Sequence, residues 1–236
     1  MKKDVMGWAL MDHYKGQENV TLKVSIDVAG EENYAASYFF RDYSEMPDLE
    51  KKALDLSSGK ILDVGAGTGI HALELQKRGQ EVCALEISDI NVQIMQERGV
   101  THVIHADFFK LQDQKYDTLL FLMNGIGLVK NMQGFEEFFQ QCQALLNPGG
   151  QILFDSSDLL YLYEEEDGSY LINLNEKYYG EVIFQTEYKG EKGEAFPWLF
   201  VDFDNLNHQA DKYGFQAELI QSGMHFDYLA RITRKI

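Results

Sequence analysis

Three glycines at alternate positions follow a short apolar segment, and they constrain this chain more than any other feature. The segment Lys60–Val64 has the composition of a buried strand and leads into Gly65, Gly67 and Gly69. Glycines allow a tight turn whose backbone can approach a ligand closely, and the positive end of the following helix favours a negatively charged ligand group. The pattern predicts a strand, loop and helix that bind a ligand at the carboxyl end of the strand.

A carboxylate follows at the spacing expected for a nucleoside ligand. Glu86 ends the second predicted strand, nineteen residues after Gly67, where a carboxylate can accept hydrogen bonds from two ribose hydroxyls. The alternative is an ordinary tight turn in which Glu86 is a solvated strand end. The combination of strand, loop, helix and spaced acid favours the nucleoside interpretation.

The glycine register separates two kinds of nucleoside ligand. Residues 67–72 satisfy the dinucleotide pattern, but they begin two residues late because the strand already ends at Gly65. In the earlier register an acid, Asp63, precedes the glycines, and an acid at an apolar strand end is costly unless it meets a cation or hydrogen-bond donors. This favours an amino-bearing ligand over a pyrophosphate, with an NAD-type oxidoreductase as an alternative.

Strand-like and helical segments alternate from residue 60 onward. We therefore expect an α/β fold with a doubly wound, mostly parallel seven-stranded sheet that ends in an antiparallel C-terminal hairpin. The predicted strands are 60–64, 81–87, 102–105, 116–123 and 151–155, the hairpin strands are 215–220 and 225–233, and the helices are 68–78, 88–98, 135–146 and 205–213.

Three further strand-like runs fall outside this alternation. Residues 20–28 alternate apolar and polar side chains, and residues 179–188 and 196–202 resemble strands within a long insertion. We expect these runs to form a small antiparallel layer beside the main sheet, with Pro197 favouring an edge position. The predicted organisation is an N-terminal cap segment (1–57), a core (58–155 and 204–236) and an insertion (156–203) that faces the substrate.

The run ILDVGAGTG (61–69) resembles the first motif of class I S-adenosylmethionine-dependent methyltransferases, which have a Rossmann-like fold. Further matches follow in order: Glu86, Ala106-Asp107-Phe108, YDTLLFLMNG (116–125) and LLNPGGQILFD (145–155). The resemblance covers roughly residues 58–155 and the C-terminal part from about 204. It implies S-adenosylmethionine (SAM) as the cofactor and methyl transfer as the activity.

The resemblance also implies roles for individual residues at the methionine and ribose ends of SAM. Gly65, Ala66 and Gly67 would pack against the methionine part, with Asp63 near its amino group. Glu86 would bind the ribose hydroxyls.

At the adenine end, the resemblance implies that Ile87 flanks the base, Asp107 accepts from its amino group and Phe108 stacks beside it. Asn124, with Gly125, would line the pocket where the methyl group is delivered.

Two further polar residues are candidates for the site. Arg41 could bind the ligand carboxylate through a charge-assisted hydrogen bond, or it could be a surface arginine that caps a helix. Asp155, at the carboxyl end of the fifth core strand, could orient or deprotonate a substrate, or it could cap a loop. His71, near the glycine loop, is expected to pack at the start of a helix. Asn124 and Asp155 are the two candidate catalytic residues.

The net charge, and the absence of motifs found in nucleic-acid methyltransferases, indicate which kind of molecule accepts the methyl group. The formal net charge is −17, and the few basic runs are short, so a polyanionic nucleic acid is an unfavourable partner. The segment Asn124–Gly127 lacks the Pro-Pro-aromatic and Pro-Cys motifs of nucleic-acid methyltransferases. We therefore expect methyl transfer to a small molecule by in-line displacement, the alternative being a non-catalytic SAM-binding regulatory module.

The insertion carries ten acidic residues and three lysines between residues 158 and 194, interleaved with tyrosines. This could recruit a cationic or amine substrate, or it could be a solvated face whose aromatic rings serve packing. Only two cysteines are present, with no metal-ligand spacing, and no apolar run is long enough for a signal peptide or a membrane span. We expect a cytoplasmic protein without a metal site.

Overall fold

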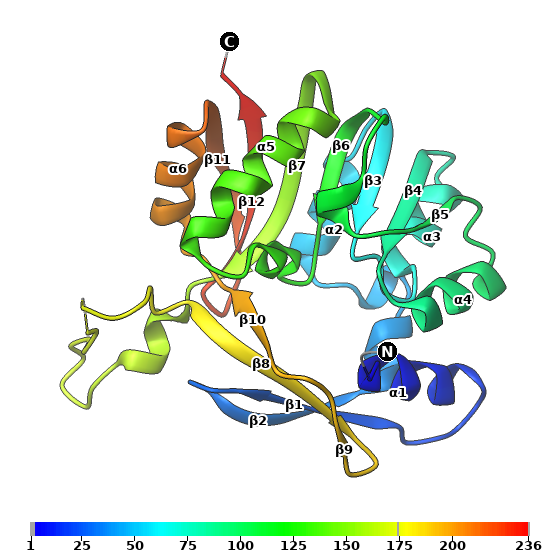
Figure 1. Ribbon diagram of the computed structural model, residues 1–236, viewed down its shortest axis with the longest axis horizontal. Coiled ribbons are helices and arrows are strands. Elements are labelled where there is room, and N and C mark those ends of the chain that lie inside the picture. The colour runs from blue at the N-terminus through cyan, green and yellow to red at the C-terminus, as the bar shows by residue number, and fades with distance from the viewer. Residues whose placement is uncertain (1–2, 174, 236) are drawn as a thin grey trace.

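The computed structural model describes residues 3–173 and 175–235, and its main feature is a seven-stranded sheet (Figure 1). The strand order is β11-β12-β7-β6-β3-β4-β5. The strands β3 to β7 are parallel, and β12 is antiparallel to both β7 and β11. The expected α/β fold with an antiparallel C-terminal hairpin is confirmed. The strands are β3 (Lys60–Val64), β4 (Glu81–Glu86), β5 (Val103–His105), β6 (Tyr116–Phe121), β7 (Leu146–Ser157), β11 (Phe215–Ser222) and β12 (Asp227–Arg234).

Helices cover both faces of this sheet, and each face packs against its helices in a separate hydrophobic core. One face carries α5 (Phe135–Leu145) and α6 (Phe203–Lys212), and the other carries α2 (Asp48–Leu56), α3 (Ile70–Lys77) and α4 (Asp89–Arg98). In α5, apolar side chains recur with helical spacing, which creates a continuous apolar stripe. They are Phe135, Phe138, Phe139 and Cys142, all of them buried.

A second, smaller sheet has the order β10-β8-β1-β2, with β9 paired to β8. All pairings are antiparallel, so the predicted antiparallel layer is confirmed, and Pro197 lies on an edge strand as expected. The strand β2 was not predicted, because its sequence GEENYA is polar and lies at the other edge. The strands are β1 (Thr21–Ile26), β2 (Gly30–Ala35), β8 (Glu181–Tyr188), β9 (Glu191–Lys192) and β10 (Phe196–Leu199).

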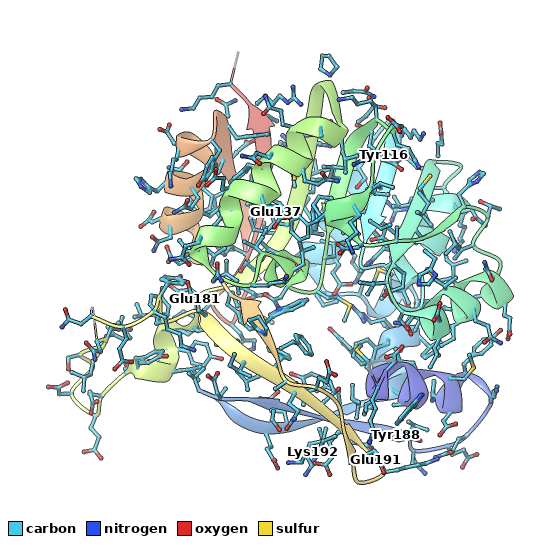
Figure 2. The ribbon with its side chains drawn as sticks, in the orientation of Figure 1. Tyr116, Glu137, Glu181, Tyr188, Glu191 and Lys192 are labelled. Atoms are coloured by element: carbon cyan, nitrogen blue, oxygen red, sulfur yellow. The ribbon has the colours of Figure 1, made fainter. Side chains whose placement is uncertain are left out.

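The small sheet lies across the carboxyl-terminal edge of the main sheet (Figure 1) and is anchored at both ends of β8. At one end the Met132 backbone N–H donates to Glu181 Oε1 at 2.9 Å. At the other end the Tyr188 hydroxyl donates to Asp12 of helix α1 (Val5–Tyr14) at 2.9 Å. Figure 2 shows Glu181 beside the main domain and Tyr188 beside α1. Because β1 comes from the predicted cap segment and β8 from the predicted insertion, these two segments form one layer.

Six 3₁₀ helices occur among the residues that the structure describes, and several border the carboxyl edge of the main sheet. They are η1 (Ala36–Phe40), η2 (Tyr43–Glu45), η3 (Phe108–Lys110), η4 (Gly125–Val129), η5 (Met132–Gly134) and η6 (Leu159–Tyr163). Both cysteines are free thiols. Within the described ranges, none of the helices combines the length and apolarity needed to cross a bilayer.

Candidate functional site

The chain order of the main sheet reverses between β3 and β6, which defines a topological switch point. Strands β4 and β5 follow β3 on one side, and β6 and β7 lie on the other. In open α/β sheets, ligands bind beyond the carboxyl ends of the strands at this point. Two segments lie at this point: the glycine loop, which follows β3, and the turn at Asn124, which follows β6. The position of a Cβ on Gly125 lies 4.0 Å from the Val64 carbonyl oxygen, so the two turns lie side by side.

The glycine loop is held against β4 by backbone hydrogen bonds. The N–H groups of Gly65 and Ala66 both donate to the Leu85 carbonyl, at 2.9 and 3.0 Å. Gly65 and Gly67 have φ angles of +71° and +56°, which side chains with a Cβ rarely adopt. A Cβ on Gly65 would meet no atom within 4 Å. The loop therefore presents bare backbone to open space, as a ligand cradle requires.

Glu86 lies beneath this loop and is only 7% exposed. Its Oε2 accepts from the Gly67 N–H at 2.8 Å, and its Oε1 accepts from the N–H groups of Ile87 and Ser88 at 2.8 and 2.9 Å. Burial raises the pKa of Glu86, although these hydrogen bonds oppose the shift. The neighbouring Ile87 side chain is 68% exposed. A fixed carboxylate beside an exposed apolar side chain is suited to a ribose and its base.

Asp63 is the clearest unsatisfied group at the site. Its side chain is buried at the end of β3, and its Oδ2 has no hydrogen-bond partner. Burial raises the pKa of Asp63 to about 6. A buried carboxyl oxygen without a partner is costly, and an amino group would supply both the donor and the positive charge. Asp63 therefore fits the amino group of an amino-acid ligand.

Arg41 does not lie on the surface, so the expectation of a surface arginine is wrong. It follows η1 and is 6% exposed. Its Nη2 donates to both oxygens of Glu50, at 2.5 and 2.6 Å, and its Nη1 donates to the Tyr38 carbonyl at 2.6 Å. The Nε of Arg41 is buried without a partner. Because Glu50 already balances its charge, only Nε is a free buried donor, and binding of a ligand carboxylate stays a prediction.

His71 lies in the first turn of α3 and is 4% exposed, as expected for a residue that packs at a helix start. It also has a partner that was not predicted, because its Nε2 lies within hydrogen-bond distance, 2.9 Å, of Glu50 Oε2. Glu50 thus accepts from two side chains. Although burial alone would raise the pKa of Glu50, that pKa is lowered because His71 and Arg41 stabilise the ionised carboxylate.

Asp107 and Phe108, two of the three residues expected at the adenine, differ in their environment. Asp107 is partly exposed and accepts from the Phe109 N–H at 3.0 Å, capping η3. Phe108 is 5% exposed, and its ring lies edge-on to Phe121 at 5.2 Å within the core. Phe108 therefore packs in the core, and its predicted stacking beside a base stays a prediction.

Asp155 caps the turn after β6. Its two oxygens accept from the backbone N–H groups of Met123 and Asn124, at 3.1 and 2.8 Å. Both of those residues have φ near +60°, so the carboxylate stabilises a strained pair. Burial raises the pKa of Asp155 to about 7. The Asn124 Oδ1 accepts from the Ser157 hydroxyl at 3.2 Å. The loop-capping interpretation is confirmed, and a catalytic role stays a prediction.

Sequence reasoning missed three residues that shape the site. Glu50 balances Arg41 and His71. Thr68 tethers η1 to the loop, because its hydroxyl donates to the Phe39 carbonyl. Trp198 packs against η4, where a Cβ on Gly127 would overlap its ring. Helical periodicity could have found Glu50, which shares the buried face of α2 with Ala53 and Leu54.

The chain is similar to known methyltransferases in both sequence and structure. Residues 36–219 match the model of a family described as a methyltransferase domain. A crystal structure of a SAM-dependent methyltransferase from Bacteroides fragilis, in complex with S-adenosyl-L-homocysteine, is 43% identical. It superimposes with a TM-score of 0.92 over 99% of this chain and 96% of that chain.

Two curated proteins are more distant. An uncharacterized methyltransferase of Staphylococcus carnosus (strain TM300) is 26% identical over 83% of this chain and 86% of its own length. A ubiquinone biosynthesis O-methyltransferase of Pasteurella multocida (strain Pm70) is 23% identical over 46% of this chain, and the match spans half of that protein.

Proposed function

This chain belongs to the methyltransferase-domain family as a class I SAM-dependent methyltransferase, and we propose that it methylates a small-molecule acceptor by in-line displacement. SAM is the cofactor. The observation that carries the proposal is the unpartnered, buried Asp63 oxygen beside the bare backbone of Gly65. The site thus offers a carboxylate and an open cradle, which match an amino-acid group attached to a nucleoside.

The residues of the glycine loop and β4 would hold SAM. Gly65, Ala66 and Gly67 would border its methionine part, with Asp63 accepting from the amino group. Glu86 would accept from the ribose hydroxyls, because its carboxylate is already oriented by three backbone donors. This orientation reduces the conformational freedom that binding must remove.

Four other residues complete the proposed cofactor site. Exposed Ile87 would flank the adenine, Asp107 would accept from its amino group, and Phe108 would stack beside the base. Arg41 would donate to the methionine carboxylate through its free Nε.

The acceptor would bind between the turn at Asn124 and the facing side of the small sheet. Paired residues of an antiparallel sheet share a face, and side chains alternate along each strand. The side that carries Trp198 therefore also carries Phe184 and Phe196. These three rings lie about 6 Å apart, and Trp198 packs on η4 directly after Asn124. A partly exposed aromatic face suits a small, largely apolar acceptor better than a polyanion.

Methyl transfer requires little covalent help from the protein. When bound, SAM supplies a methyl group on a sulfonium, which a nucleophile displaces in line. The work of the chain is to align the acceptor at about 3 Å and to exclude water. Asp155 can take up a proton released by the acceptor, because its pKa of about 7 lies near neutrality. Asn124, fixed by Asp155 and Ser157, would orient the acceptor.

Ligand-induced thermal stabilisation tests the cofactor assignment. S-adenosylhomocysteine (SAH) should raise the melting temperature and NAD should not, because only a ligand that binds the native state stabilises it. Glu86→Ala should weaken SAH binding by about 1–3 kcal/mol, since a charged acceptor to two hydroxyls is lost. The exposed Glu81→Ala, at the far end of the same strand, is the matched control. Stabilisation by NAD alone would contradict the assignment.

Turnover tests the acceptor. SAH formation should occur with a member of a panel of small amines, phenols and carboxylic acids, and not with tRNA. Transfer to tRNA alone would overturn the small-molecule proposal, and SAH binding without turnover would indicate a regulatory module. The net charge of −17 supports a small-molecule acceptor over a nucleic acid. The two free cysteines support a cytoplasmic location.

A further inference from the structure

We propose that Glu50 is a positioning residue of the cofactor site, and that with Arg41 and His71 it forms a buried charge triad coupling the N-terminal segment to the glycine loop. This rests on the proposed function for the ligand, whose amino-acid end would meet the triad. Neither the glycine motif nor the acceptor side requires a carboxylate at this place.

The geometry of the triad is that of a closed junction between three elements. Arg41 follows η1, Glu50 lies in α2, and His71 lies in the first turn of α3, directly after the glycine loop. The three residues are 6%, 3% and 4% exposed. The two carboxylate oxygens of Glu50 lie 2.5 and 2.6 Å from Arg41 Nη2, and Oε2 lies 2.9 Å from His71 Nε2.

Arg41 also contacts Tyr38 in η1, and so links the triad to that short helix. Its Nη1 donates to the Tyr38 carbonyl at 2.6 Å, and its guanidinium lies 3.9 Å from the centroid of the Tyr38 ring. The same short helix is tied to the loop by the hydroxyl of Thr68, whose carbonyl accepts from Arg98 at 2.6 Å. The N-terminal segment is therefore held at two points, by Thr68 within the glycine loop and, through the triad, by His71 in the first turn of α3.

Two buried atoms of opposite character have no hydrogen-bond partner, one in the triad and one in β3. Arg41 Nε is a donor and Asp63 Oδ2 is an acceptor, and each is buried. An ion pair that served stability alone gains nothing from such orphans, because each one costs free energy. A zwitterionic amino-acid group presents the complementary pair of charges. We infer that Glu50 fixes the position of the Arg41 Nε donor and contributes to the electrostatic potential at the Asp63 carboxylate.

Several charged groups face the triad from the elements around it. Asp63 in β3 and Asp155 in β7 both respond to the charges of Glu50 and His71, and Glu50 raises the pKa of each. Tyr38 in η1 responds to Arg41, Glu50 and Asp155, and Glu86 in β4 acts on Asp63. The charge of the triad therefore bears on the ionisation of Asp63, which must be a carboxylate to bind an ammonium group.

Opposite charge changes within the triad provide a test. The affinity for SAH is measured by calorimetry between pH 5 and 9 for wild type, Glu50→Gln, Arg41→Gln and the double variant. Glu50→Gln removes a negative charge and leaves Arg41 unbalanced, so the acidic midpoint of binding should fall. Arg41→Gln leaves Glu50 unbalanced, so the midpoint should rise. Each shift should be about half a pH unit or more, and the double variant should return toward wild type.

The matched control is Asp55→Asn, which removes a carboxylate from the solvent side of the same helix and should leave the midpoint in place. Shifts of the two single variants in the same direction, or no shift in either, would overturn the proposal. If Glu50→Gln does not fold, Arg41→Gln against the charge-balanced double variant gives the same comparison. Absence of SAH binding in wild type would instead refute the cofactor assignment, and SAH binding without acceptor turnover would leave the triad test valid.

Discussion

The cofactor edge of the main sheet and the small sheet that faces it are built in different ways. The cofactor edge is made by contiguous segments, β3 with its loop and β4 with Glu86, and backbone hydrogen bonds hold the two together. The small sheet joins strands from distant parts of the chain, and β1 and β8 meet there through Lys23 and Glu187. Its facing side is aromatic and partly exposed.

This difference separates the two tasks of the enzyme. The cofactor is the same for every methyltransferase of this kind, so its half of the site can be fixed by a short local motif. The acceptor varies, and the half that would contact it is formed by side chains on an attached layer. We therefore expect changes in one half to leave the other largely intact, which three experiments address.

The largest effect should follow removal of a core ring under the main sheet. Phe138→Ala should lower the free energy of unfolding by about 3–5 kcal/mol, because the fully buried ring leaves a cavity among aromatic neighbours. The matched change in the small sheet, Phe196→Ala, should cost about 1 kcal/mol, since that ring is 38% exposed. Urea unfolding of both variants measures this, and equal losses would contradict a loosely packed small sheet.

An intermediate effect should follow truncation of Trp198. Trp198→Ala should lower kcat/KM for the acceptor about tenfold, which corresponds to about 1.4 kcal/mol, while the Kd for SAH changes less than twofold. The reason is that Trp198 packs on η4, on the proposed acceptor side of the site. Ile183→Ala, on the opposite side of the small sheet, is the control. Weaker SAH binding in Trp198→Ala would show that the two halves are coupled.

The smallest effect should be a pH dependence of the free energy of unfolding. It should originate at Asp155, between the cofactor half and the acceptor half of the site. Burial raises the pKa of Asp155 to about 7 in the folded protein, from 3.8 for the solvent-exposed carboxyl group of the unfolded chain. The folded state therefore binds more protons than the unfolded state between about pH 4 and 7, so this group makes the protein less stable as pH rises through that window. Relative to Asp155→Asn, wild type should gain about 1 kcal/mol of stability from pH 8 to pH 6. Chemical unfolding at both pH values tests this, and an identical pH dependence in the two proteins would refute the raised pKa.

The sequence predicted the main sheet well because its strands are continuous apolar runs bounded by glycines, as in 60–64 and 116–123. The edge strand β2 escaped prediction because GEENYA is polar on both sides. Arg41 was expected either at the ligand or at the surface, since no local pattern reveals that an acid nine residues later will bury it. Glu50 escaped because its partners, Arg41 and His71, come together only through tertiary packing.

The pairing of β1 with β8 also has a consequence for the order in which the chain acquires its structure during synthesis. The hairpin of β1 and β2 leaves the ribosome before the main sheet, but the free edge of β1 gains its partner β8 only after the parallel strands β3 to β7 have been made. Until then the exposed edge could pair with another nascent chain. Lys23 on β1 and three polar residues of β2, Glu31, Glu32 and Asn33, oppose such pairing. The polarity that hid β2 from prediction thus protects the newborn chain from aggregation.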